Sequence, residues 1–130
     1  MAYFLDTSVI VDCIKGKQSA IDLVESLDGE LYSSYICLAE LYEGVLRSQQ
    51  PKEKETGLKT FFKSLSSIFG IDENIANKFG EVRAWLKQKG EVIEDFDIIN
   101  AATCLVYDLT LVTYNQKHFS RIPHLKLVLS

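Results

Sequence analysis

Apolar residues along this chain alternate between short runs, which are typical of strands, and longer stretches with helical spacing. The first run, Ala2 to Leu5, predicts a buried strand. Thr7 and Ser8 then provide hydroxyl groups of the kind that cap helices, and we expect that helix over Val9 to Ile14, before Gly16. Strands that alternate with helices are typical of a parallel sheet covered by helices on both faces.

The rest of the chain follows the same alternation, and one strand is expected at either of two positions. The third strand is expected near residues 67–71, or at Val92 and Ile93. The expected fold is α/β, a three-layer α/β/α sandwich around a central, mostly parallel sheet, in a single domain over residues 1–130. The pattern predicts further helices over 19–27, 38–45, 51–65, 72–89 and 96–107, and further strands over 31–36, 109–114 and 125–129.

Length and composition are those of one ordinary globular domain. The chain has 130 residues and 47% hydrophobic residues, enough to build a core without disulfides or a structural metal. Its three cysteines are odd in number and include no Cys-x-x-Cys pair, which argues against a disulfide framework and against a zinc site. No stretch approaches the roughly 20 apolar residues of a membrane span, and the N-terminus does not resemble a signal peptide. We therefore expect a cytoplasmic protein with no membrane contact.

The charge balance at first argues against a nucleic-acid ligand. The formal net charge is −4, and the sequence pI is about 5.2. The distribution is uneven, because no acidic residue follows Asp108 whereas Lys117, Arg121 and Lys126 do. The last part of the chain is expected either to form a local basic patch or simply to be a solvated surface.

Acidic and amide residues fall where strands are expected to end. In an open parallel sheet, ligands bind beyond the carboxyl ends of the strands. Asp6 closes the first strand and Glu40 lies soon after the second. Asp97 opens the buried helix, and Asn115 follows a later strand. These four residues are expected to converge, although Asp6 and Asp97 could also simply stabilise the N-termini of helices.

Carboxylates held together in this way need a counter-charge. Two of them about 4 Å apart repel by roughly 4 kcal/mol at an effective dielectric near 20. A cation relieves that repulsion, and raised pKa values are the alternative. Oxygen ligands favour Mg²⁺ or Mn²⁺, and no His or Cys stands at a sequence spacing that would recruit zinc. Other acids are expected to be solvated or to cap helices: Asp12, Glu43, Glu94 and Asp95.

Together these segments resemble the signature motifs of the PIN domain, and most closely those of VapC-type toxins from prokaryotic toxin–antitoxin pairs. The motifs are Asp6-Thr7-Ser8, Ala39-Glu40-Leu41 and the segments 97–102 and 111–119, and they occur in order over almost the whole chain. The resemblance implies a small α/β/α domain that cleaves RNA, of the tRNA or rRNA class, with Mg²⁺ or Mn²⁺. It also implies a homodimer, silenced by a VapB-like antitoxin whose C-terminal segment lies across the active site.

The resemblance also assigns roles to particular residues. It implies that Asp6, Glu40 and Asp97 form the metal-binding acidic set. Asn115 and Thr113 are implied to orient water or a ligand, and Thr7 to support the site.

Two positions depart from the family pattern. His118 stands where many relatives have Asp or Glu, which removes an outer carboxylate and puts a second metal in doubt. Asn100 replaces an apolar residue, and the sequence offers no consequence for this change.

The predicted reaction is metal-assisted hydrolysis of a phosphodiester bond by water, without a side-chain nucleophile. Two aromatic-rich stretches, 32–42 and 58–69, are expected to be either a dimer interface or simply core faces. Candidate phosphate contacts are Lys15, Lys17, Arg47, Lys117 and Arg121.

Three alternatives remain open at this point. One is a signalling receiver domain with Asp72 as its phosphoacceptor, although the paired acids expected after the first strand are missing and Lys126 lacks a following Pro. The second is a PIN-like module that binds RNA or protein without catalysis. The third is a free-standing RNA-processing nuclease rather than a toxin.

Overall fold

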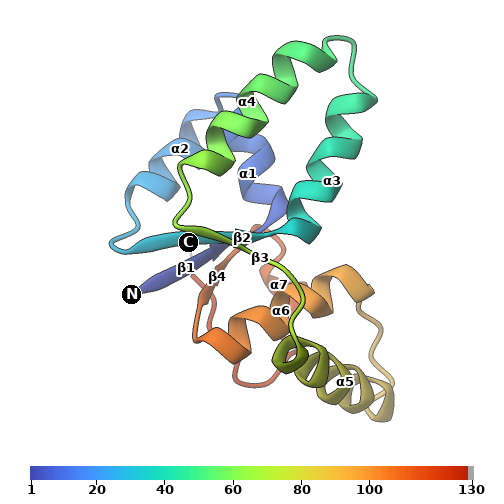
Figure 1. The fold of residues 1–130 in the computed structure, drawn as a ribbon. Helices are drawn as coiled ribbons and strands as arrows, with labels where there is room; N and C mark the ends of the chain where they lie inside the picture. Colours follow the sequence, from blue (N-terminus) through green and yellow to red (C-terminus); the bar gives the residue numbers. More distant parts are fainter. Residues whose placement is uncertain (129–130) are drawn as a thin grey trace.

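A computed structural model describes residues 1–128 and shows a four-stranded sheet between two layers of helices (Figure 1). All strand pairs are parallel, in the order β3-β2-β1-β4. This confirms the predicted α/β/α sandwich. The strands are β1 (Ala2–Leu5), β2 (Glu30–Ser34), β3 (Ser67–Phe69) and β4 (Thr110–Val112).

The helices divide between the two faces of the sheet according to their place in the chain. The first four lie on one face and the last three on the other (Figure 1). On the first face are α1 (Thr7–Ile14), α2 (Gln18–Glu25), α3 (Tyr35–Leu46) and α4 (Pro51–Lys63); on the second are α5 (Glu73–Gln88), α6 (Asp95–Tyr107) and α7 (Gln116–Phe119).

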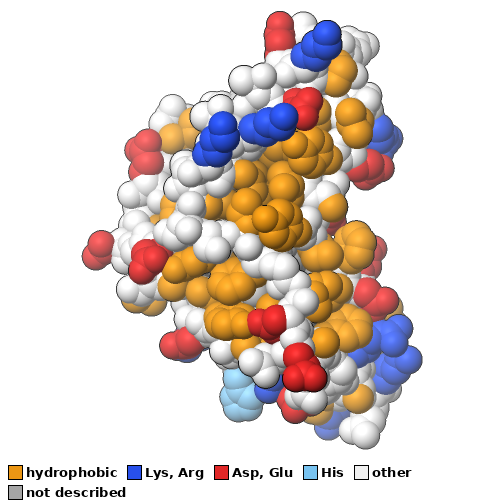
Figure 2. All heavy atoms as spheres, in the orientation of Figure 1, with side chains coloured by type: hydrophobic (Ala, Val, Ile, Leu, Met, Phe, Trp, Pro, Cys, Tyr) orange, Lys and Arg blue, Asp and Glu red, His pale blue; other side chains and the backbone are white. Residues whose placement is uncertain are grey.

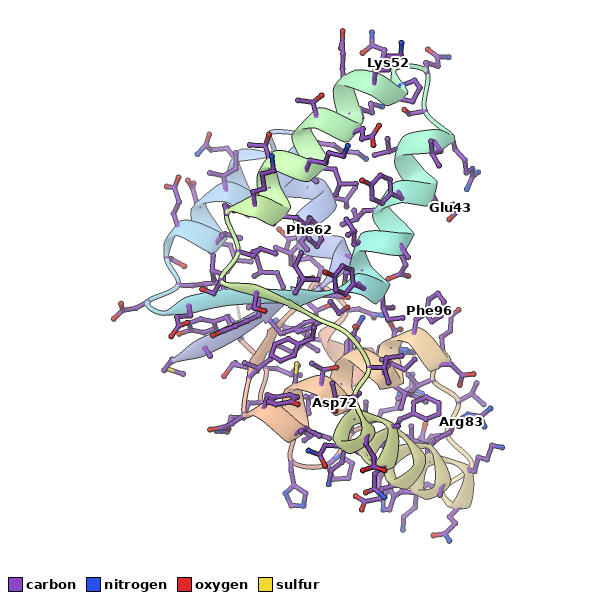
Figure 3. The ribbon with its side chains drawn as sticks, in the orientation of Figure 1. Glu43, Lys52, Phe62, Asp72, Arg83 and Phe96 are labelled. Atoms are coloured by element: carbon purple, nitrogen blue, oxygen red, sulfur yellow. The ribbon has the colours of Figure 1, made fainter. Side chains whose placement is uncertain are left out.

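Strand β1 is buried on both faces and so supplies two separate cores. Successive side chains of a strand point to opposite faces. Tyr3 and Leu5 pack with buried residues of α1, α3 and α4, whereas Phe4 packs with those of α5 and α6. Phe62 belongs to the first core and lies between α4 and the sheet (Figure 3). Burial on both sides explains why β1 reads as a continuous apolar run rather than an alternating one.

The strand order determines where a ligand site is expected. From β1 the chain proceeds to β2 and β3 on one side, then crosses to β4 on the other side of β1. The carboxyl ends of β1 and β4 therefore form the topological switch point of the sheet, the usual position of a ligand site in such folds. Asp6 and Thr113 directly follow these two strands, and the backbone N–H of Asp6 donates to the carbonyl of Val112 at 3.0 Å.

Several strand boundaries differ from the sequence prediction. β2 ends at Ser34, because the Ser34 hydroxyl accepts a hydrogen bond from the Cys37 N–H at 3.1 Å and so caps α3 one residue later. The third strand lies at 67–69, and Val92 and Ile93 form no strand. The expected final strand is reduced to one bridge, between Leu111 and Leu127, with Leu129 outside the described residues.

The start of α1 also differs from the prediction. The helix begins at Thr7, and Asp6 occupies its N-cap position without a side-chain capping bond, so Thr7 and Ser8 are not caps. The predicted helix ends are confirmed at Gly16 and Gly90, which have φ values of +79° and +69°. Within residues 1–128, no helix combines the length and the apolar character needed to cross a bilayer.

Candidate active site

Asp6 is a buried carboxylate surrounded by hydroxyl groups. It is 7% exposed, and its Oδ2 accepts hydrogen bonds from the hydroxyls of Thr113 at 2.8 Å and of Ser8 at 3.4 Å. Burial raises the pKa of Asp6, although the hydrogen bonds from Thr113 and from the backbone of Thr7 act in the opposite direction. A buried acid with a perturbed pKa at the switch point is a candidate for function.

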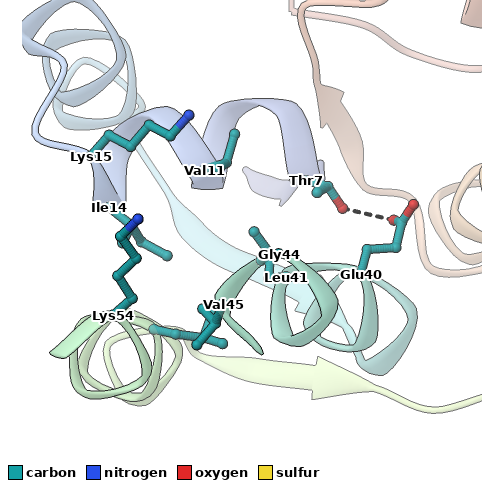
Figure 4. Close-up of a pocket in the computed structure, with 10 residues that line it drawn as sticks. Thr7, Val11, Ile14, Lys15, Glu40, Leu41, Gly44, Val45 and Lys54 are labelled. Carbon is teal, nitrogen blue, oxygen red and sulfur yellow. Dashed lines mark hydrogen bonds between the residues drawn. The ribbon is translucent and has the colours of Figure 1, made fainter. Parts of the chain in front are cut away.

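Glu40 reaches the same place from α3. The hydroxyl of Thr7, the first residue of α1, donates to Oε1 of Glu40 at 2.8 Å (Figure 4). This hydrogen bond joins α1 to α3 and places Thr7 beside Glu40. Burial raises the pKa of Glu40, and the negative charges of Asp6 and Asp97 raise it further.

Asp97 lies in the first turn of α6, beside the ring of His118 from α7. Its Oδ2 is 3.1 Å from Nε2 of His118, an ion-pair distance, yet this nitrogen is buried and makes no hydrogen bond of normal geometry. Burial raises the pKa of Asp97 and the charge of Asp6 adds to this, while His118 partly offsets both. Asp6, Glu40 and Asp97 are thus near enough for their charges to interact, although no strand precedes Asp97.

Asn115 lies close to this cluster but is exposed. Its backbone N–H donates to the Thr113 hydroxyl at 3.0 Å, and its side chain does not cap α7. Thr113 therefore connects the backbone of Asn115 to the carboxylate of Asp6. Ser8 adds a second link, because its hydroxyl accepts from the N–H of Tyr114 at 3.2 Å.

Sequence reasoning missed three contributors to this site. Glu94, which was expected only to cap a helix, occupies the N-cap of α6 without a side-chain capping bond, and its charge raises the pKa of Glu40 and of Asp97. Its position three residues before Asp97, on the same face of a helix start, was the available signal. Ser8 belongs to the Asp6-Thr7-Ser8 motif but was expected only to cap a helix, and His118 comes close to Asp97 only through tertiary packing.

The possible ligands in this cluster are of the chemical kind that a hard divalent cation binds. Its members are carboxylates whose charges raise one another's pKa, and a cation relieves that repulsion. As they stand, no three His, Cys, Asp or Glu side chains among residues 1–128 are close enough to hold an ion. Binding a metal would therefore require side-chain movements in this cluster.

Comparisons with known proteins identify the family. Residues 3–125 match the family model of the PIN domain. The chain belongs to the PIN-domain family. The receiver-domain alternative is therefore wrong, and Asp72 instead caps α5 by accepting a hydrogen bond from the Ile75 N–H at 2.8 Å.

Relatives of this PIN domain are named as VapC ribonucleases. Ribonuclease VapC2 of Rickettsia felis is 35% identical over 130 residues, which cover 98% of this chain and 96% of the relative. A tRNA(fMet)-specific endonuclease VapC of Shigella flexneri is 28% identical over 127 residues, which cover 97% of this chain and 96% of the relative. The crystal structure of VapBC2 from Rickettsia felis, bound to a DNA fragment from their promoter, matches with a TM-score of 0.90 at 34% identity over 98% of both chains.

The candidate phosphate contacts of the PIN domain differ in whether a carboxylate lies close to their positive charge. Lys17 lies 3.5 Å from Asp12, Arg47 lies 3.4 Å from Glu43, and Arg121 lies 3.0 Å from Glu91. Each of these three charges is therefore partly neutralised by a neighbour. Within the described part of the chain, no carboxylate lies within 4 Å of the other two candidates, Lys15 and Lys117.

A cavity of about 380 Å³ extends from Glu40 between α1, α3 and α4 (Figure 4). Thr7 and Glu40 lie at one end, and Lys15 and Lys54 lie at the other. The walls between these ends are apolar, and they are formed by Val11, Ile14, Leu41, Val45 and Leu58. Glu40 is therefore accessible along an apolar groove with a basic end.

Proposed function

We propose that this PIN domain is an endoribonuclease that hydrolyses RNA phosphodiester bonds with a divalent metal ion, Mg²⁺ or Mn²⁺. The observation that carries the proposal is the convergence of Asp6, Glu40 and Asp97 at the switch point of the sheet, with a raised pKa on each. The names of the relatives as ribonucleases support the same activity.

Asp6, Glu40 and Asp97 would hold the ion through their carboxylate oxygens. A divalent ion bound there supplies Lewis acidity towards a phosphate and lowers the pKa of a coordinated water. The chain contributes the positions of the ligands: Thr113 and Ser8 orient Asp6, and Thr7 orients Glu40.

Asn115 completes the proposed set of catalytic residues. Its side chain follows β4 at the edge of the cluster and is exposed, so its amide is available to orient the attacking water or the substrate. Asp6, Glu40 and Asp97 remain the residues on which the proposed reaction depends.

The proposal is tested by comparing the wild-type protein with Asp97→Asn. Both are incubated with tRNA and rRNA in Mg²⁺, in Mn²⁺ and in EDTA, and cleavage is followed on denaturing gels. We expect cleavage that depends on metal and falls by more than about 100-fold in Asp97→Asn, because a proposed ligand loses its charge. Activity of Asp97→Asn equal to that of the wild type, above all in metal-depleted buffer, would reject the proposal.

Asp95→Asn is the matched control for this experiment. Asp95 lies two residues away in the same helical turn, but it is exposed and pairs with Arg83 at 2.9 Å. Its substitution changes the net charge by the same amount without touching the cluster. Cleavage by Asp95→Asn should stay close to that of the wild type.

We further propose that the protein is the toxin of a type II pair and is bound by a VapB-like antitoxin. The similarity to VapBC complexes supports this partner, and the open groove beside Glu40 offers room for a segment of it. A relative specific for tRNA(fMet) supports structured RNA of the tRNA or rRNA class as the substrate.

A homodimer is proposed on the basis of surface apolar residues. Figure 2 shows apolar side chains gathered between α3 and α4 and over the β3 edge of the sheet. In the predicted stretch 58–69, Phe61, Leu65 and Phe69 are half-buried. In the other predicted stretch, 32–42, Tyr35 is 56% exposed at the start of α3. Both stretches also contribute side chains to the cores, so only part of each is available for an interface.

The alternative to a toxin is a free-standing RNA-processing PIN nuclease. A short neighbouring gene for a DNA-binding protein that forms a complex with this chain distinguishes the toxin from that alternative. A non-catalytic PIN-like module is less favoured, because Asp6, Glu40 and Asp97 are all retained and lie together.

A further inference from the structure

The ring of His118 lies beside Asp97 in the acidic cluster, and its Nε2 makes no hydrogen bond of normal geometry. Nε2 is buried, makes no hydrogen bond among residues 1–128, and lies 3.1 Å from Oδ2 of Asp97. Its charge also lowers the pKa of Asp6, which follows β1, as well as that of Asp97 in the first turn of α6. A buried ring nitrogen without a hydrogen bond of normal geometry is uncommon in proteins, and it suggests a ligand for that atom.

Packing holds the imidazole in this position. The His118 side chain is only 20% exposed, and its ring stands edge-on to that of Phe119, with centroids 5.6 Å apart and planes at 85°. Phe119 is fully buried in the core beneath α6, so the short helix α7 is anchored there. The nitrogen is therefore oriented before any ion arrives, and little conformational freedom is lost on binding.

The spacing of the two atoms fits neighbouring ligands of one ion. Metal–ligand bonds of about 2.1 Å in an octahedron place adjacent ligand atoms about 3.0 Å apart. The 3.1 Å between Nε2 of His118 and Oδ2 of Asp97 matches that value. A hydrogen bond would have a similar length, but this contact lacks the geometry of one.

We propose that His118 is a nitrogen ligand of the metal ion, adjacent to Asp97, and that it makes the site prefer Mn²⁺ to Mg²⁺. This inference rests on the proposed metal-dependent function and specifies the ion. Imidazole nitrogen suits transition metals, whereas Mg²⁺ strongly favours oxygen ligands. Replacing an outer carboxylate by His118 thus changes the selectivity of the site rather than only removing a charge.

Metal binding by untagged protein without RNA tests this inference directly. Mn²⁺ affinity is measured by electron paramagnetic resonance of the free ion, and pulsed measurements detect coupling between the bound ion and a ¹⁴N nucleus. We expect the wild type to show imidazole ¹⁴N coupling and to bind Mn²⁺ at least about tenfold more tightly than Mg²⁺. In His118→Asn the coupling should disappear, and Mn²⁺ affinity should fall by about 10- to 100-fold.

His124→Asn is the matched control, because His124 is the only other histidine in the chain. It is exposed and has a φ of +67°, a conformation that asparagine tolerates well. This variant should keep both the coupling and the affinity. In a third variant, His118→Asp, the coupling should be absent and the preference should shift towards Mg²⁺, because an all-oxygen set is restored.

The outcomes separate this inference from the proposed function. Mn²⁺ bound to the wild type without ¹⁴N coupling, or coupling that persists in His118→Asn, overturns the role of His118 and leaves a carboxylate-only site. If the wild type binds no Mn²⁺ at millimolar concentration, this inference and the metal dependence of the proposed nuclease both fail. Coupling that is lost only in the His118 variants supports the inference even if no RNA in the panel is cleaved.

Discussion

The Asp6 carboxylate serves the proposed chemistry, but its burial destabilises the folded state at neutral pH. Burial raises its pKa, so the native state retains a proton that the unfolded chain has already lost. The stability associated with this proton is present below the unfolded pKa of about 3.9 and is lost as the pH rises through the folded pKa. At neutral pH the protein therefore carries a destabilising charge at Asp6.

Asp6→Asn is consequently expected to raise the free energy of unfolding in metal-free buffer at pH 7.5, by roughly 0.5 to 2 kcal/mol, the scale of other stabilising substitutions. The amide oxygen can still accept the hydrogen bond from Thr113. Urea unfolding from pH 7.5 down to pH 4 measures the gain, which should shrink towards acid. Asp28→Asn, at an exposed loop position, should show no such pH-dependent gain. A loss of stability in Asp6→Asn at pH 7.5 would mean that the hydrogen bonds outweigh burial.

At the scale of elements, a buried polar network joins the two helices that carry Glu40 and Asp97. The hydroxyl of Ser34, the N-cap of α3, donates to Oδ1 of Asn100 on α6 at 2.7 Å, and Nδ2 of Asn100 donates to Sγ of Cys37 at 3.5 Å. Asn100 is fully buried one helical turn beyond Asp97. The polar residue that departs from the family pattern thus fixes α3 against α6.

Asn100→Leu should destabilise the protein by about 1 to 3 kcal/mol, because Ser34 loses its buried partner. Combining it with Ser34→Ala should cost less than the two single changes added together, with a coupling of about 0.5 to 3 kcal/mol in a double-mutant cycle of urea unfolding. Thr103→Val is the control, since Thr103 is equally buried on α6 but bonds only within its helix, to the Ile99 carbonyl. Strict additivity would show that the network does not act as a unit.

The elements of the fold could be predicted from sequence wherever local periodicity decides them. The helical stretches and β1 were found because their apolar spacing reflects burial directly. The boundary at Ser34 was not predicted, because Tyr35 and Ile36 favour strands. They begin a helix here because Ser34 accepts the capping hydrogen bond from Cys37. Local patterns also did not predict the short helix α7.

The candidate site was predictable only in part for a related reason. The positions of Asp6 and Glu40 follow from the rule that ligands bind beyond strand ends, whereas the strand expected before Asp97 does not form. The approach of His118 to Asp97 depends instead on how Phe119 anchors α7 in the core, which is a contact between distant parts of the chain. No spacing along the sequence encodes that contact.

For the whole molecule, the net charge of −4 must be compatible with an RNA substrate. The distribution of charge provides the answer, because Lys15 and Lys54 stand at the far end of the groove that begins at Thr7 and Glu40 (Figure 4). Lys15 follows Thr7 by eight positions, about 12 Å along α1. Phosphates on either side of a bound scissile group could reach this basic end while the remaining surface repels non-specific RNA.

Lys15→Ala is therefore expected to weaken RNA binding and to reduce the slope of log affinity against log salt by about 1. Fluorescence anisotropy with labelled tRNA from 50 to 200 mM salt measures both quantities, with Ca²⁺ in place of Mg²⁺ to limit cleavage. Lys52→Ala is the control, because Lys52 lies at the outer end of α4, remote from the acidic cluster (Figure 3). Equal slopes for all three proteins would place the RNA path elsewhere.

The central position of β1 also has a consequence for the order of events during folding. Three of the four strands can pair before β4 joins them, because β1 pairs with β2 and β2 with β3. The β1–β4 pair and the hydrogen bond from Thr113 to Asp6 join positions that are 107 residues apart, and closing so long a loop is slow. The edge of the sheet that positions Asp6 is therefore expected to form late, after the helical layer that carries Glu40.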